Sequence, residues 1–228
     1  MARDLPPSSP FAGDDGSPDA HLAPALALED DGERLRAVVA ALAEARVLVP
    51  VVAHLDEPAR SGQKQAGAAM VTVSTPDGRA AIPVFSGMDS LRAWRPDARP
   101  VPVPAPRAAL ASVTEGDGLL VLDPAGPRSV LVPRPAVWAL AQGQAWVPPE
   151  TDEQLRTHVV AALTAVPHVL AVELGPGPAG ATQVVLDLPA GLSRERVGTI
   201  TAAAQAELAR SELVARRIDA VQLRVRAC

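Results

Sequence analysis

The chain has 228 residues, of which 48% are hydrophobic and 21% are charged, a composition typical of a globular protein. Aromatic residues make up only 2%, so the predicted core consists of Val, Leu and Ala, with four large anchors: Phe85, Trp94, Trp138 and Trp146. Residues 1–33 hold eight acidic residues against one arginine, whereas the remainder carries a net charge of +2. A near-neutral folded part lacks the broad positive surface that binds nucleic acid, so nucleic acid is excluded as the expected partner.

Cysteine usage and targeting features favour the cytoplasm. Cys228 is the single cysteine, so no internal disulfide is expected. The acidic start of the chain lacks the basic and apolar regions of a signal peptide. A long apolar run such as Val47–Ala53 is far below the ~18 residues of a membrane-spanning helix. We therefore expect a cytoplasmic protein with no membrane partner.

The chain is predicted to begin with a disordered acidic tail, followed by a first domain over residues 32–148. The tail comprises residues 1–31, where Pro, Gly, Ser and Asp cannot offset chain entropy by burial. Helical spacing of apolar residues and turn sequences such as Thr75-Pro76-Asp77-Gly78 indicate the elements of the domain. These are a helix (32–46), a strand (47–55), a polar loop (56–68), a hairpin (70–74 and 80–85), a short helix after Ser86, an extended segment (100–106), a helix (107–114), a second hairpin (119–122 and 129–132) and a last helix (135–142).

Residues 149–228 predict a second domain with the order α-β-β-α-β. Its predicted elements are a helix from Thr151, strands at 169–174 and 182–188, a long helix from Ser193 to about Arg216, and a strand at 218–225. Capping patterns mark several helix starts: Ser86 with Asp89, Thr151 with Gln154, and Ser193 alone. The predicted fold class is α+β, with two small domains, each a mostly antiparallel sheet with helices packed on it.

Two sequence blocks carry a family resemblance. They are Ile82-Pro83-Val84-Phe85-Ser86, followed by Leu91 and Trp94, and Arg134-Pro135-Ala136-Val137-Trp138-Ala139-Leu140. With them the first domain resembles the N-terminal domain of the SseB (enhanced serine sensitivity protein) family. Residues 149–228 look like the C-terminal region that often accompanies that domain. The resemblance implies a fold more than a function, because the family is named after a phenotype, and it carries over no catalytic residue.

A glycine-rich segment, Gly175-Pro176-Gly177-Pro178-Ala179-Gly180, formally matches the dinucleotide-binding pattern G-x-G-x-x-G. The residues after it predict a strand, whereas the dinucleotide site requires a helix whose N-terminus faces the pyrophosphate. Pro176 and Pro178 also lack the N–H groups that would bind phosphate. We expect a hairpin loop there and no cofactor.

No other pattern predicts a catalytic or metal site. The histidines His21, His54, His158 and His168 lack the close spacing of zinc ligands. Lys64, the only lysine, is interpreted as a solvated loop charge. A hidden acid–base site stays open at this level, because catalytic groups converge from distant positions in the chain.

Four arginines near the end of the chain form a candidate interaction patch: Arg216, Arg217, Arg224 and Arg226. Arg224 and Arg226 are predicted on one strand face. The alternatives are a solvated surface or a site that pairs with the acidic tail, within the molecule or in a homo-oligomer. RNA is disfavoured, because no aromatic residue lies between these arginines to stack on bases.

The leading hypothesis is a non-enzymatic protein-interaction or regulatory module whose partner is another protein. The alternative is a small-ligand sensor or enzyme linked to serine or sulfur metabolism, an analogy drawn from the family's name. A pocket of ~300 Å³ or more with converging polar groups would support the alternative, and a flat surface would support the module.

Overall fold

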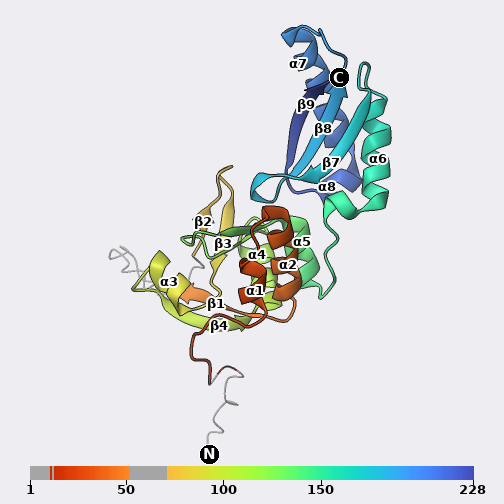
Figure 1. Ribbon diagram of the computed structural model, residues 1–228. Helices are drawn as coiled ribbons and strands as arrows, with labels where there is room; N and C mark the ends of the chain where they lie inside the picture. The colour runs from red at the N-terminus through yellow and green to blue at the C-terminus, as the bar shows by residue number, and fades with distance from the viewer. Residues whose placement is uncertain (1–10, 12, 52–70) are drawn as a thin grey trace, which may run out of the picture.

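The computed structural model describes residue 11 and residues 13–51 and 71–228. The chain forms a lower and an upper body in Figure 1, joined by a single linker after α5. We call the part up to residue 148 the N-terminal unit and residues 149–228 the C-terminal unit. Separate clusters of buried apolar side chains lie within the two units. Helices pack on mostly antiparallel sheets, so the predicted α+β class is confirmed.

The elements of the N-terminal unit follow the predicted order. They are α1 (Leu22–Leu26), α2 (Asp31–Leu42), β1 (Arg46–Val51), β2 (Val73–Ser74), β3 (Ala80–Val84), α3 (Met88–Trp94), β4 (Arg99–Pro104), α4 (Ala105–Glu115), β5 (Leu120–Leu122), β6 (Val130–Val132) and α5 (Arg134–Ala141). Both predicted hairpins, β2–β3 and β5–β6, are antiparallel. The remainder of the strand predicted over 47–55, the loop at 56–68 and Lys64 lie outside the described residues.

The four-stranded sheet has the order β2-β3-β5-β6, and β1 pairs with β4 in a second, two-stranded sheet. Strands β3 and β5 run parallel, and α4 connects back between them. Leu48 of β1 forms an antiparallel bridge to Phe85 at the end of β3, which joins the two sheets. Buried residues of α1, α2, α4 and α5 share one apolar cluster with the strands, so this layer of helices forms the core of the unit.

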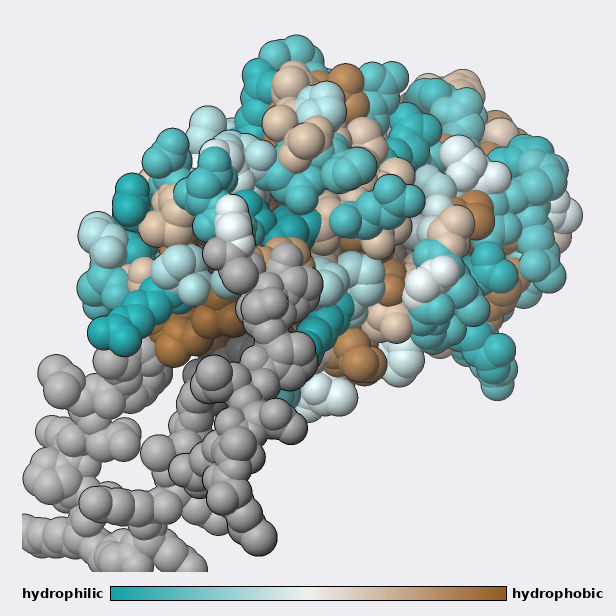
Figure 2. All heavy atoms as spheres, turned by 90° about the horizontal axis from the view of Figure 1, so that it is seen from below, coloured by the Kyte–Doolittle hydropathy of each residue, from teal (hydrophilic) through white to brown (hydrophobic). Residues whose placement is uncertain are grey.

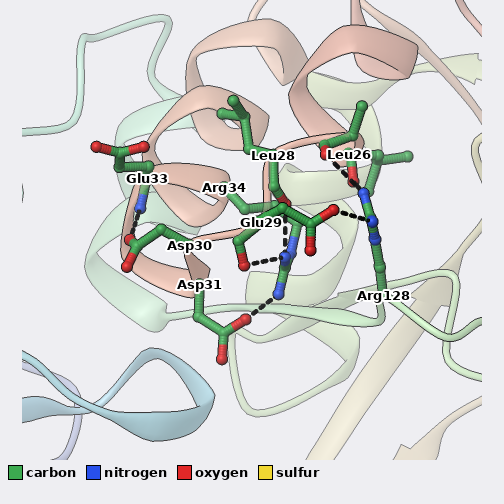
Figure 3. A network of polar contacts seen from close by, with 9 residues as sticks. Leu26, Leu28, Glu29, Asp30, Asp31, Glu33, Arg34 and Arg128 are labelled. Carbon is green, nitrogen blue, oxygen red and sulfur yellow. Dashed lines mark hydrogen bonds and ion pairs between the residues drawn. The ribbon is translucent and has the colours of Figure 1, made fainter.

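The ordered structure begins well before residue 32. Helix α1 buries Leu22 and Ala25 in the core. The backbone carbonyl groups at the end of this helix and just after it have no partner within the helix. Those of Leu28 and Glu29 accept hydrogen bonds from Arg34, and those of Leu26 and Ala27 accept from Arg128 (Figure 3). The predicted disorder of residues 1–31 is therefore corrected for residues 13–31, while residues 1–10 and 12 lie outside the described part.

Helix starts differ from the predicted caps in two places. The N-cap of α3 is Gly87, because the side chain of Ser86 donates instead to Asp123 Oδ2 at 2.6 Å. The N-cap of α6 is Asp152, whose Oδ1 accepts from the N–H of Leu155 at 3.1 Å; Thr151 belongs to the preceding short 3₁₀ helix. Both predicted capping boxes are wrong: the hydroxyl of Ser86 donates to Asp123 instead of capping α3, and at α6 the cap is the side chain of Asp152, one residue after Thr151.

The C-terminal unit has helices on one face of a three-stranded sheet. Its elements are η1 (Pro149–Thr151), α6 (Glu153–Thr164), β7 (Ala171–Pro176), η2 (Pro178–Gly180), β8 (Thr182–Leu188), α7 (Arg194–Arg210), α8 (Glu212–Arg217) and β9 (Val221–Ala227). The strand order is β7-β8-β9, antiparallel for the first pair and parallel for the second. Strand β9 therefore lies at an edge of the sheet that no other described strand covers.

The long helix predicted from Ser193 to about Arg216 is two helices. Ser193 is the predicted N-cap of the first, and its hydroxyl accepts from the N–H of Arg196 at 3.2 Å. The break occurs at Ser211, whose hydroxyl accepts from the N–H of Val214 and also lies 2.8 Å from His158 Nε2 on α6. A serine that caps a new helix competes with continuation of the old one, so α8 turns away after Ser211.

None of the helices within residues 13–51 and 71–228 is both long and apolar enough to cross a bilayer.

Candidate functional site

A buried carboxylate links the two units. Asp219 lies in the turn between α8 and β9, and its side chain is only 3% exposed. Its Oδ1 accepts a hydrogen bond from Arg79 Nη1 at 2.8 Å and lies 3.5 Å from Arg134 Nε. The bond to Asp219 raises the pKa of Arg79 above its ordinary value. Because both arginines belong to the N-terminal unit, this ion-pair group holds the units together.

The glycine-rich segment is the hairpin loop that was predicted, since β7 and β8 pair on either side of it. It also has a role that its sequence did not indicate. Gly180 has φ +75°, and a Cβ there would lie 3.1 Å from the carbonyl oxygen of Leu131 in β6. A Cβ on Gly32 of α2 would lie 2.9 Å from Pro176. Glycines on both sides therefore allow the loop to sit close against the N-terminal unit.

Three of the hollows in the described part of the chain lie near the junction of the units. One of about 110 Å³ is lined by charged groups of both units, including Arg34, Arg217 and Asp219. A second, of about 360 Å³, lies between α2 and the linker and has a mostly apolar lining. Trp146 lines both, and its Nε1 is buried with no hydrogen-bond partner among the described residues. The third, of about 290 Å³, lies between the edge strand β9 and helices α7 and α8.

The candidate arginine patch is spread over two elements. Arg216 and Arg217 belong to α8, where they pair with Glu212 at 3.2 Å and with Asp152 at 2.6 Å. Their positive charges are therefore compensated within the C-terminal unit, at the end of the helix where cations are favoured.

Arg224 and Arg226 project from the sheet face that the helices leave open. Leu223, which precedes Arg224 in β9, packs toward the apolar cluster, so the alternating residues Arg224 and Arg226 face away from it. Arg226 pairs with Asp187 at 2.7 Å and Glu173 at 3.2 Å, and its hydrogen bond holds the pKa of Asp187 below the ordinary value. Arg224 has no ion-pair partner among the described residues. It is the one member of the patch whose charge the described structure leaves uncompensated.

A large aromatic side chain is exposed on the N-terminal unit. Trp138, predicted as a core anchor, is 46% exposed on α5, so that prediction is wrong. The reason is that the buried face of α5 is occupied by Ala136, Val137 and Leu140. Helix α4 packs directly on α5 and exposes Leu110 by 54%. Figure 2 shows the molecule from below, where hydrophobic residues form separate areas between hydrophilic ones.

The other predicted anchors are at least partly buried. Phe85 is fully buried, and its ring centroid lies 5.3 Å from that of Trp94. Among the histidines, His168 contacts Arg196 at 3.0 Å, and His54 lies outside the described residues. Over residues 13–51 and 71–228, no group of three or more His, Cys, Asp or Glu side chains has an arrangement that could hold a metal ion.

Sequence reasoning missed the residues that join the units. Asp219 follows a helix in an ordinary polar turn, and nothing in the local sequence separates it from a solvated carboxylate. The glycine pattern was found, but its tight contact with β6 depends on a segment far away in the chain.

Comparison with known families extends these observations. A family model described as the SseB protein N-terminal domain matches residues 19–139. The match begins just before α1 and ends within α5, and it contains the first of the two sequence blocks on which the resemblance rested and all of the second except Leu140. The match does not extend over the C-terminal unit. No curated protein matches the chain.

Proposed function

The chain belongs to the SseB family, and from this premise we propose that it is a non-catalytic protein-interaction or regulatory module of the cytoplasm. The observation that carries the proposal is the exposure of Trp138. The chain has three tryptophans, and one of them, Trp138, is 46% exposed. Exposed tryptophans of this kind often contribute much of the binding energy at protein interfaces. The single cysteine is compatible with a reducing compartment.

The position of Trp138 favours a protein partner. Its helix, α5, and the adjacent α4 expose two large apolar side chains on one layer of the unit. Both helices are anchored in the core by their buried faces, so the surface that they present is rigid and needs little ordering when a partner binds.

A site-specific cross-linker tests the proposal. With p-benzoylphenylalanine at position 138, we expect cross-links to a partner protein in the cytoplasm of the source cell. The partner, once purified, should bind Trp138→Ala about 30-fold more weakly, corresponding to the loss of ~2 kcal/mol at an interface anchor.

Leu170→Ala is the matched control, because Leu170 is 58% exposed on the other unit. It should bind the partner as the original chain does. Equal binding by Trp138→Ala, or cross-links no stronger at position 138 than at position 170, would overturn the proposal.

The alternative, a small-ligand sensor or enzyme, is favoured by the second hollow. Its volume of about 360 Å³ falls within the range of ligand pockets, and it contains Arg36 and the indole of Trp146. Arg36 has no ion-pair partner among the described residues, and Trp146 Nε1 is buried without a hydrogen bond. A metabolite that raises the melting temperature of the chain and loses this effect in Arg36→Ala would support this function.

A further inference from the structure

Among the described residues, no strand pairs with the outer edge of β9, so a complete set of its backbone groups is unpaired there. In the parallel ladder with β8 the even-numbered residues make the bonds, as shown at its two ends by Thr182 N–H to Ala220 O and Cys228 N–H to Leu188 O. The odd-numbered residues therefore turn their N–H and C=O groups outward. They are Val221, Leu223, Val225 and Ala227.

The edge is flanked by an apolar hollow on its helix side. The hollow of about 290 Å³ is lined by Leu208 of α7, Val214 of α8 and Leu223 of β9, among others. Val221 and Val225 are 38% and 41% exposed, which is high for valines on the helix-covered side of a sheet. An additional strand beside β9 would cover these side chains and place its own alternate side chains in the hollow.

The opposite side of the same edge is positively charged. Arg224 faces away from the helices and has no ion-pair partner among the described residues. On the helix side, Arg134 borders the hollow but already pairs with Asp219 at 3.5 Å. Charge complementarity thus selects acidic side chains at every second position of an added strand.

A second copy of this chain does not fit the edge. If the β9 strands of two copies paired antiparallel over their full length of seven residues, Arg224 would lie opposite Arg224 of the other copy, and Gln222 would lie opposite Arg226. Like charges directly opposite each other destabilise a strand pair, and such edge charges are a known protection against self-association.

We propose that the free edge of β9 binds an extended segment of a partner protein in which apolar residues alternate with acidic ones. The apolar residues enter the hollow between β9 and helices α7 and α8, and the acidic residues meet Arg224. This inference rests on the proposed interaction function, and it gives the partner's chemistry at a surface separate from Trp138.

Two synthetic peptides test it with the full chain. We expect a labelled peptide of four Val-Glu repeats to bind, and one of four Val-Lys repeats to bind at least about tenfold more weakly. In amide hydrogen exchange, the Val-Glu peptide should protect Val221, Leu223, Val225 and Ala227. The even-numbered amides, already bonded to β8, should change little.

Arg224→Glu should reverse the preference between the peptides, and Val225→Pro should weaken both by removing an outward N–H from an edge position that tolerates proline. Arg216→Glu on α8, where Arg216 is 76% exposed, is the matched control and should bind as the original chain does. Because Arg224→Glu removes no core contact, it keeps the test decisive even if Val225→Pro fails to fold.

Three results would overturn the inference. One is equal binding of both peptides, another is protection away from β9, and the third is a dimer in sedimentation that Val225→Pro abolishes. If the cross-linked partner binds Arg224→Glu as tightly as the original chain, the edge is not its site, yet the interaction function carried by Trp138 stands.

Discussion

At the scale of single residues, Asp123 shows how one residue joins the ends of two strands, β5 and β3. It follows β5 with φ +51°, a left-handed conformation that Asp and Asn tolerate better than most residues. Its backbone N–H donates to the carbonyl of Val84, at the end of β3. Its carboxylate accepts from both the N–H and the hydroxyl of Ser86, at 2.9 and 2.6 Å. The carboxylate and the backbone conformation therefore act together at this turn.

Substitutions at Asp123 should separate these two contributions. Asp123→Ala loses both accepted bonds and the tolerance of positive φ, so we expect the free energy of unfolding to fall by about 2–3 kcal/mol. Asp123→Asn keeps the size, one acceptor and the left-handed preference, and should lose about half as much. Urea denaturation measures both values, and equal losses would show that the charge alone matters.

At the scale of elements, β3 and α1 depend on neighbours that are distant in sequence. Pro83 lies inside β3, where its missing N–H would usually break a central strand. It is tolerated because, within the described residues, β3 changes partners there: β2 pairs with Ala80 and Ala81, and Leu48 of β1 pairs with Phe85. Helix α1 is only five residues long and is stable because Leu22 is fully buried.

The contribution of α1 can be measured. Leu22→Ala should lower the free energy of unfolding by about 2–5 kcal/mol, since it removes a fully buried side chain from the main core. Leu26→Ala, in the same helix but only partly buried, is the control and should cost clearly less. If Leu22→Ala changed the urea midpoint by no more than this control, α1 would be a loosely attached segment in solution.

At the scale of the whole molecule, the arrangement of the two units depends on a few specific contacts. They are the ion-pair group of Asp219 with Arg79 and Arg134 and the close approach of the Gly180 loop to Leu131. These are polar or backbone contacts rather than a continuous apolar core. Interfaces of this kind between units usually permit relative motion once a contact is removed.

Asp219→Asn should loosen the two units while leaving each folded, because it removes a buried charge on which two arginines converge. We expect protease cleavage in the linker between Gln142 and Pro148 to become several-fold faster, and the radius of gyration in X-ray scattering to increase. Asp77→Asn is the control, since Asp77 also pairs with Arg79 but belongs to the same hairpin. Identical cleavage rates in the two variants would mean that other contacts hold the units together.

The sequence by itself determined the elements and their order. Hydrophobic periodicity located most of the helices and strands, turn residues located both hairpins of the N-terminal unit, and Ser193 marked the start of α7. Two short blocks were sufficient to identify the family, because they combine core residues and strand ends that the fold requires. Helix and strand periodicity, turn residues and helix caps each depend on residues close together in the chain, so the sequence alone predicts them.

The tertiary structure alone decided which residues are free to act. It buried Leu22, which lies in the segment predicted to be a disordered tail, and it exposed Trp138, which was predicted to anchor the core. In the structure Ser86 bonds to Asp123 and does not cap a helix. Among the described residues Arg224 has no ion-pair partner, whereas Arg226 pairs with two carboxylates. The physical reason is that burial and charge compensation are properties of surroundings assembled from distant parts of the chain, which no local pattern of residues records.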